Sequence, residues 1–228
     1  MITHFLVSEV HSLSEENYDI QEYLQDYTES SPDKEIRIIN AAINIFSEKG
    51  FEATRTREIA DRAGIAEGTI FRYFPTKDAI LERMVPLLIR VMLPRFTGPI
   101  ERIIKNHATD SVENIFFEII TDRLRMIREN GKFIKSVVPE LIHRAPLMQQ
   151  MEANVLPVVE QFVGKVVEYG KERGELDRDL DSHLVMIQLL GFIMSYAMFG
   201  GDDLKKQDRE LRAFVNNTVK GWNSKCKP

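Results

Sequence analysis

Two short segments of helical spacing, joined by a turn with a glycine, restrict the fold of this chain more than any other sequence feature. The letters TREIADRA (residues 56–63) are followed by the four-residue turn GIAE and then by GTIFRYF (68–74). Short helices joined by such a turn cross steeply, as in a helix-turn-helix. Small residues are needed where the helices touch, and Ala60 and Ala63 supply them. Gly64 permits a positive φ in the turn.

Helical spacing continues on both sides of this pair. A stripe of apolar residues begins after Lys34 and ends at Lys49-Gly50, because glycine commonly terminates a helix. After the pair, Pro75 is a stop signal and Thr76 is a predicted N-cap of a longer helix. Pro86 should kink or shorten that helix. The residues of the first stripe are Ile39, Ala42, Ile43 and Phe46.

The remainder of the chain also has helical rather than strand periodicity. We expect four or five further helices, over residues 111–128, 132–144, 150–172, 182–199 and 208–222. Asp110 and Glu113 are the predicted cap pair of the first of them. The sequence therefore predicts an all-α fold. We expect an N-terminal three-helix helix-turn-helix domain and a C-terminal helical domain for ligand binding and dimerisation.

The charge divides the chain into segments. Residues 1–33 contain eight acids and no Lys or Arg, whereas residues 34–83 contain nine bases and eight acids. The net charge of −5 therefore comes from the N-terminal segment. A protein that reads base edges needs a basic face and not a basic chain, so this charge is compatible with DNA binding without arguing for it. The predicted segments are an acidic extension (1–33), a DNA-binding domain (34–80) and an effector and dimerisation domain (81–228).

The residues around the turn resemble a known family. The stretch AAINIFSEKGFEATRTREIADRAGIAEGTIFRYFPTKDAIL closely resembles the N-terminal domain of TetR-family transcriptional regulators. The likeness covers roughly residues 36–82 without a gap. It includes Lys-Gly before the first turn and Ala-Gly-Ile at the second helix and its turn. It also includes Gly-Thr-Ile-Phe-x-Tyr-Phe in the third helix and Lys77 at the start of the fourth. The C-terminal two-thirds of the chain is only weakly similar to the family, through Arg-Gly-Glu-Leu-Asp before a long apolar helix.

This resemblance implies that the chain binds operator DNA. The first positions of the second helix and Lys77 correspond to phosphate contacts in the family, and Arg72 is the best candidate for reading a base. Two residues depart from the family pattern. Phe71 replaces the usual Tyr and cannot donate a hydrogen bond, and Arg55 replaces a Thr or Ser cap, so half of the capping box with Glu58 is lost. The implied DNA-binding residues are Arg55, Thr56, Arg57, Ala66, Glu67, Gly68, Thr69, Phe71, Arg72, Tyr73 and Lys77.

Residues 84–228 hold eight of the nine methionines, together with several phenylalanines. This composition is typical of an adaptable apolar cavity or of an ordinary helical core. The resemblance favours a cavity for a small, mostly apolar effector that releases the repressor from DNA. The expected ligand-binding residues are Met126, Phe133, Met151, Phe192 and Tyr196.

The segment from His183 to Gly201 has no formal charge, a length compatible with a membrane span. Gln188, Ser195 and three glycines interrupt it, which favours a helix with one face in the core and one in a subunit interface. The resemblance implies a homodimer, in which this helix and the last one form a four-helix bundle with their copies. The residues assigned to the bundle from the last helix are Leu211, Phe214, Val215, Val219 and Trp222.

We expect a cytoplasmic protein without a membrane segment and without enzymatic activity. Cys226 is the one cysteine, so neither an intrachain disulfide nor a CxxC metal site can form. No HExxH, GxSxG or glycine-rich phosphate loop is present. The sequence nominates no catalytic residue, metal or cofactor. Two alternatives stay open: a regulator or interaction protein whose DNA-binding face is masked by the acidic tail, and an enzyme built on a helical bundle.

Overall fold

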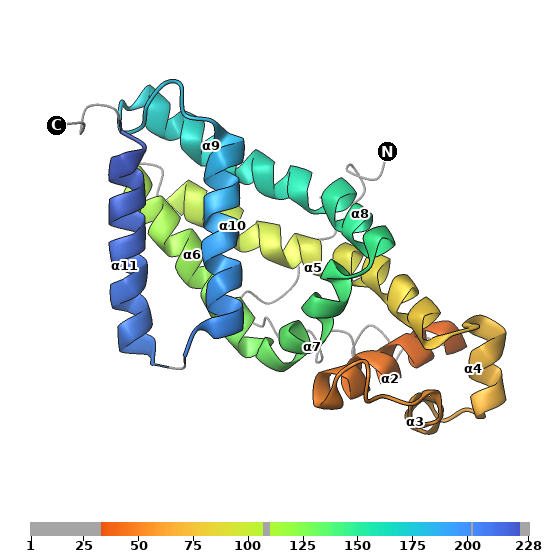
Figure 1. Cartoon of the computed structure of the whole chain (residues 1–228). Coiled ribbons are helices and arrows are strands. Elements are labelled where there is room, and N and C mark those ends of the chain that lie inside the picture. The colour runs from red at the N-terminus through yellow and green to blue at the C-terminus, as the bar shows by residue number, and fades with distance from the viewer. Residues whose placement is uncertain (1–32, 107–109, 202, 224–228) are drawn as a thin grey trace. The chain divides into compact units, whose positions relative to one another are not determined.

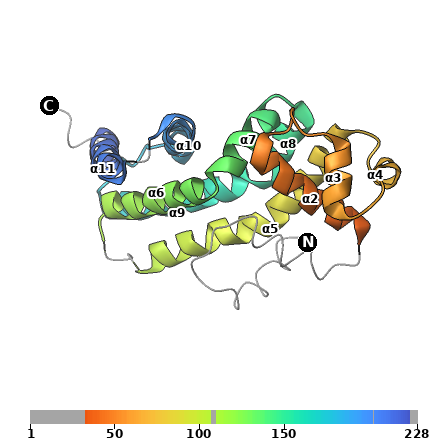
Figure 2. The ribbon, with the colours of Figure 1, turned by 90° about the horizontal axis from the view of Figure 1, so that it is seen from below.

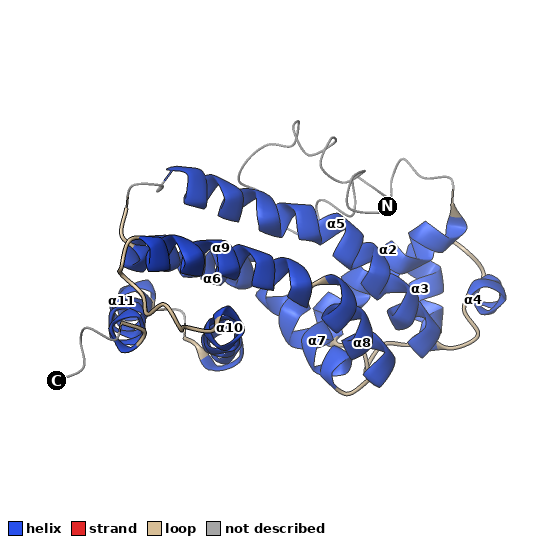
Figure 3. Ribbon diagram, turned by 90° about the horizontal axis from the view of Figure 1, so that it is seen from above, coloured by secondary structure: helices blue, strands red, loops and turns tan. Residues whose placement is uncertain are grey.

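A computed structural model describes residues 33–106, 110–201 and 203–223 of the chain. Every regular element in these ranges is an α-helix, as Figure 3 shows, so the all-α prediction is confirmed. The described residues form two compact units. The first holds residues up to 94 together with 129–154, and the second holds 95–128 together with residues from 155 onward. This packing division does not test the functional segments, whose boundaries stay a prediction.

Helix α2 (Lys34–Lys49) organises the first unit (Figure 1). Asp33 caps its start by accepting a hydrogen bond from the Glu35 amide at 2.9 Å. Gly50 ends it with φ of 86°, a conformation that favours glycine. The predicted stripe is confirmed, because its members are buried in the core of this unit: Ile39, Ala42, Ile43 and Phe46.

Three helices follow α2 in the same order as predicted: α3 (Thr56–Ala63), α4 (Glu67–Tyr73) and α5 (Lys77–Asn106). The predicted N-cap of α5 is confirmed, since the Thr76 hydroxyl accepts from the Ala79 amide at 3.1 Å. The prediction that Pro86 shortens this helix is wrong, because α5 continues through Pro86 to Asn106. Figure 2 shows α4 at the outer edge of the first unit, beside α3.

Helices α7 (Gly131–Ile142) and α8 (Ala145–Asn154) complete the first unit, and α7 packs against α2. The single helix expected over 150–172 is wrong. The chain breaks at Val155 between α8 and α9 (Leu156–Glu172), and Pro157 lies in the first turn of α9. Proline is tolerated there because the first amides of a helix lack intrahelical partners.

The second unit contains α6 (Val112–Glu129), α9, α10 (Ser182–Phe199) and α11 (Leu204–Gly221). The predicted cap pair of α6 is wrong by one residue, since the Ser111 hydroxyl accepts from the Asn114 amide at 3.3 Å. The core contains buried side chains from all four helices, among them Phe116, Val166, Leu189 and Leu211.

Trp222 is buried within its own chain rather than offered to a second subunit. Its ring meets Phe116 edge to face at 5.6 Å, and its indole N–H donates to Gln188 at 2.9 Å. Leu211 and Val215 are also buried in this core. Part of the α11 face that the sequence assigned to a dimer bundle therefore stabilises the single chain.

Helix α10 keeps an exposed apolar face. In the described ranges it is the one helix long and apolar enough to cross a membrane, and 22% of it is buried. One such helix is weak support for a membrane segment, because apolar helices of soluble proteins have the same length and composition. Its exposed apolar residues are Leu184, Ile187, Met194, Met198 and Phe199.

Candidate nucleic-acid interface

Helices α3 and α4 are the predicted pair of short helices and pack against each other. Gly64 lies between them in the left-handed region, with φ of 65° and ψ of 41°. Ala60 and Ala63 are both buried, and α3 packs against both α2 and α4. The Ile65 amide donates to the Ala60 carbonyl at 3.1 Å, which satisfies the end of α3. The residues therefore produce the expected turn for the expected reasons.

Polar contacts that the sequence analysis missed hold α3 on α2. The Arg62 guanidinium donates to both carboxylate oxygens of Glu48, and Lys49 pairs with Glu58. These hydrogen bonds hold the pKa of both carboxyl groups below the ordinary value. Arg37 donates to the Ala63 carbonyl at 2.7 Å. Only the tertiary packing of α3 on α2 brings these distant residues together, so helical spacing could not reveal them.

Helix α4 has one face in the core and one in solvent. Ile70 is fully buried, and Phe74 just beyond the helix is 3% exposed. Phe71 and Tyr73 are 50% and 43% exposed, and Arg72 between them is also exposed. Large exposed aromatic side chains beside an arginine are unusual on a surface that binds nothing. This outer face of α4 can therefore enter a groove.

The start of α3 carries two exposed arginines, Arg55 and Arg57. The Arg55 amide donates to the Glu58 carboxylate at 2.9 Å, whereas the arginine side chain has no acceptor atom with which to complete a capping box. The prediction that half of the box is lost is confirmed. The Thr56 hydroxyl donates to Glu67 at 2.8 Å, which ties the first turn of α3 to the first turn of α4.

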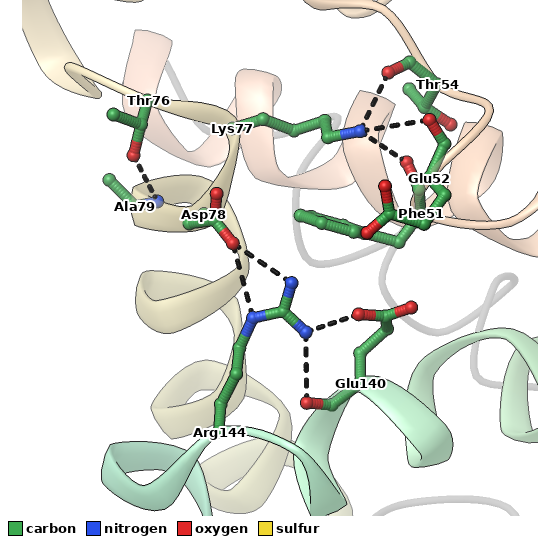
Figure 4. A network of polar contacts seen from close by, with 9 residues as sticks. All are labelled: Phe51, Glu52, Thr54, Thr76, Lys77, Asp78, Ala79, Glu140 and Arg144. Carbon is green, nitrogen blue, oxygen red and sulfur yellow. Dashed lines mark hydrogen bonds and ion pairs between the residues drawn. The ribbon is translucent and has the colours of Figure 1, made fainter.

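Lys77 makes contacts that its expected phosphate role does not require (Figure 4). Its ammonium group donates to the carbonyl oxygens of Phe51, Glu52 and Thr54 at 2.7, 3.2 and 3.1 Å. It also lies 4.3 Å from the centroid of the Phe51 ring. All three N–H donors of a lysine can be used by these carbonyls. Lys77 therefore fastens the α2–α3 turn to the start of α5.

Four acids of the first unit are held in ion pairs with cations of the same unit. Glu35, Glu48, Glu58 and Asp78 all face cationic partners in this unit. Three further exposed arginines lie at the start of α3 and on the outer face of α4: Arg55, Arg57 and Arg72. A local basic face thus exists on a chain of net negative charge.

The residues expected to bind an effector lie in both units. Phe133 and Met151 belong to the first, and Met126, Phe192 and Tyr196 to the second. Phe192 stacks on Phe214 with centroids 3.9 Å apart, and the Tyr196 hydroxyl donates to Glu210. Burial, together with that hydrogen bond, raises the pKa of Tyr196 to about 12. Tyr196 also lines a pocket of about 210 Å³ at the α10–α11 turn. The effector site stays a prediction.

No group of three or more potential metal-binding side chains occurs among the residues that the structure describes. The acidic extension lies outside the described residues except for Asp33, and so does Cys226.

Comparison with known proteins supports the assignment of the interface. Residues 38–84 match the family model "Bacterial regulatory proteins, tetR family". The HTH-type transcriptional regulator UidR of Escherichia coli is 25% identical over 84% of this chain and 95% of its own length. The HTH-type transcriptional repressor KstR of Mycobacterium tuberculosis is 43% identical over 24% of each chain.

Solved structures share the fold. A TetR/AcrR-family regulator from Thermobifida fusca has a TM-score of 0.60 and 21% identity, over 81% of this chain and 97% of its own. FadR of Bacillus subtilis, solved with stearoyl-CoA, has a TM-score of 0.55 and 21% identity over 83% of this chain and 97% of its own.

Proposed function

Since the chain is a transcriptional regulator of the TetR family, we propose that it is a homodimeric repressor that a small, mostly apolar effector releases from a palindromic operator. The observation that carries this proposal is the outer face of the helix-turn-helix. Arg55, Arg57, Phe71, Arg72 and Tyr73 are all exposed there, while Glu48 and Glu58 nearby are held in ion pairs.

The proposed DNA contacts follow from position on the two helices. Arg55 and Arg57 flank the first turn of α3, where their charges would bind phosphate. Arg72 lies on the exposed face of α4, where its guanidinium would read guanine through two hydrogen bonds. The aromatic rings beside it would make apolar contacts with bases or sugars. The remaining proposed positions, at which the backbone or a short side chain approaches phosphate, are Thr56, Ala66, Glu67, Gly68 and Thr69.

Lys77 has a different proposed role from that of the arginines. Because its ammonium group is engaged by three carbonyl oxygens, it would support DNA binding by holding the turn that precedes α3. A direct phosphate contact by Lys77 would require some of these hydrogen bonds to be exchanged.

Dimerisation would bury the exposed face of α10. Leu184 and Ile187 lie one helical turn apart on this face, and each exposes more than half of its side chain. A contiguous exposed apolar patch on a helix without formal charge marks an interaction surface. The twofold copy of α10 is the proposed partner, with part of α11 beside it.

The proposed effector is apolar because the surrounding helices are rich in Met and Phe. The structure of FadR with stearoyl-CoA shows that a protein of this fold can take a long acyl chain. The proposed lining of the effector site is Met126, Phe133, Met151, Phe192 and Tyr196. Effector binding would shift α5, and this shift would change the separation of the recognition helices from about 34–36 Å, one turn of B-DNA.

The mechanism requires reciprocity between effector and DNA, which provides its test. Stearoyl-CoA and free fatty acids would first be screened by thermal unfolding of the purified dimer. A compound that raises the melting temperature should lower the affinity of the protein for operator DNA. Operator DNA should lower the affinity of the protein for that compound by the same factor. Unchanged operator affinity with such a compound bound would contradict release by an effector.

A second candidate function is regulation by a masked interface. Residues 1–33 contain eight acids and no Lys or Arg. This composition favours masking, because carboxylates can compete with phosphates for the same arginines. Deleting residues 1–30 should then raise operator affinity at low salt. Equal affinity of the full-length and shortened proteins would rule out masking.

A further inference from the structure

Arg144 lies in the short connection between α7 and α8 and contacts three other segments of the first unit (Figure 4). Its Nε and Nη2 atoms donate to the Asp78 carboxylate at 3.2 and 3.0 Å. Its Nη1 atom donates to the Glu140 carbonyl at 3.1 Å and to the Glu140 carboxylate. Its guanidinium carbon lies 4.7 Å from the centroid of the Phe51 ring.

Two of the three partners of Arg144, Asp78 and Phe51, belong to the DNA-binding part of the unit. Asp78 is in the first turn of α5, directly after Lys77. Phe51 is in the α2–α3 turn and is only 3% exposed, with Phe46 packed edge to face at 5.1 Å. Figure 4 shows the Phe51 ring between the Lys77 ammonium group and the Arg144 guanidinium. Arg144 thus contacts the segments that enter and leave the helix-turn-helix.

The charge of Arg144 is retained at every ordinary pH. Burial alone would lower its pKa, but the hydrogen bonds with Glu140 and Asp78 outweigh burial and raise it. With two carboxylates and two cations around one ring, the group of Phe51, Lys77, Asp78, Glu140 and Arg144 is neutral overall. Charge-assisted hydrogen bonds of this kind have defined directions, so they restrict orientation as well as distance.

We infer that Arg144 is a positioning residue that fixes the orientation of the reading helices relative to α7 and α8. The inference rests on the proposed function and deepens it, because a dimer recognises half-site spacing only when its reading helices are held in place. Helix α7 packs on α2, and the apolar part of any such packing is non-directional. Arg144 adds directional contacts on either side of the helix-turn-helix, and these would restrict its rotation against α7 and α8.

The test compares operators whose half-sites are separated by the selected spacing or by one base pair more or less. The wild-type protein should strongly prefer one spacing. Arg144→Gln should bind that spacing about tenfold more weakly and should lose most of the discrimination against the other two. Binding to DNA of unrelated sequence should stay within about twofold, because it depends on the phosphate contacts, which are intact.

Two further variants separate positioning from folding. Asp78→Asn removes only the carboxylate charge at the start of α5 and should also relax the spacing preference, and the double variant should add little to Arg144→Gln alone. Arg83→Gln is the matched control, because it breaks an ion pair between α5 and α2, to Glu35, without contacting α7 or α8. It should keep the full preference for one spacing.

The outcomes distinguish this inference from the proposed function. If the wild-type protein binds no palindrome, the proposed function fails. If the wild-type protein reads a palindrome, and folded Arg144→Gln and Asp78→Asn both keep its spacing preference, only the positioning role is overturned. A spacing preference relaxed equally by Arg83→Gln would also overturn it, because the effect would then be general loosening of the unit.

Discussion

Replacing Lys77 by methionine should destabilise the protein although the site is on the surface of the molecule. Methionine keeps the length and apolar stem of lysine but removes the ammonium group. Three carbonyl oxygens lose a donor, those of Phe51, Glu52 and Thr54. The Phe51 ring also loses a cation at 4.3 Å from its centroid.

The magnitude follows from how these carbonyls are placed. Those of Phe51 and Thr54 are bonded in partly buried positions, where a charged donor contributes about 1 kcal/mol or more each after allowance for solvent. The Glu52 carbonyl is exposed and can bond to water instead. The contact with the ring adds about 0.5 kcal/mol. The free energy of unfolding should therefore fall by about 2–3 kcal/mol, which lowers the melting temperature of a chain of this size by about 5–10 °C.

Thermal unfolding followed by circular dichroism would measure this change, with Lys34→Met as the control. Lys34 is an exposed lysine of the same unit, and its replacement should leave the melting temperature within about 2 °C. The salt dependence of operator binding provides a second readout, because loss of a phosphate contact lowers its slope by about one. An unchanged melting temperature with a slope lowered by one would refute the fastening role and support a phosphate contact.

Three other predictions follow from single residues. Arg72→Ala should weaken binding to the selected operator about 10- to 100-fold and remove the preference at one base pair of each half-site, as measured by titration of operators substituted at that pair; equal losses on all sequences would instead indicate a phosphate contact. Gly64→Ala should lower the free energy of unfolding by about 1–2 kcal/mol in urea, because φ at this position is 65°. Gly68→Ala, in a helix with open space around the added carbon, should not lower it. Ile187→Glu should convert the dimer to a monomer by light scattering, because it places a charge on the exposed apolar face of α10; Thr121→Glu on an exposed position of α6 should not.

The helices around the turn were predictable because local chemistry ends each of them. Gly50 and Gly64 adopt positive φ at the ends of α2 and α3, and Pro75 follows α4. The effect of a proline inside a longer helical pattern was not predictable. Pro86 lies within α5, whereas Pro157 opens α9 after a break. Which outcome occurs depends on the packing of the flanking turns, and sequence periodicity does not report it.

The site was predictable as a set of exposed positions but not as a network. The position of Ile70 in the apolar pattern marks the inward face of α4, so Phe71 and Arg72 are assigned to the outward face. Phe51 lies far from both Lys77 and Arg144 in the sequence, so only the tertiary fold reveals that these two cations contact the turn at Phe51. For the same reason, Trp222 could be recognised as a buried anchor but not assigned to its own chain.

The most direct test of DNA recognition is selection of bound sequences from random duplex DNA by the full-length protein at two salt concentrations. The account predicts enrichment of a palindrome whose half-site centres are about one helical turn apart, with affinity that falls as salt rises. Enrichment only after removal of residues 1–30 would support the masked interface instead. No enriched sequence from either protein would contradict the claim that α3 and α4 read DNA.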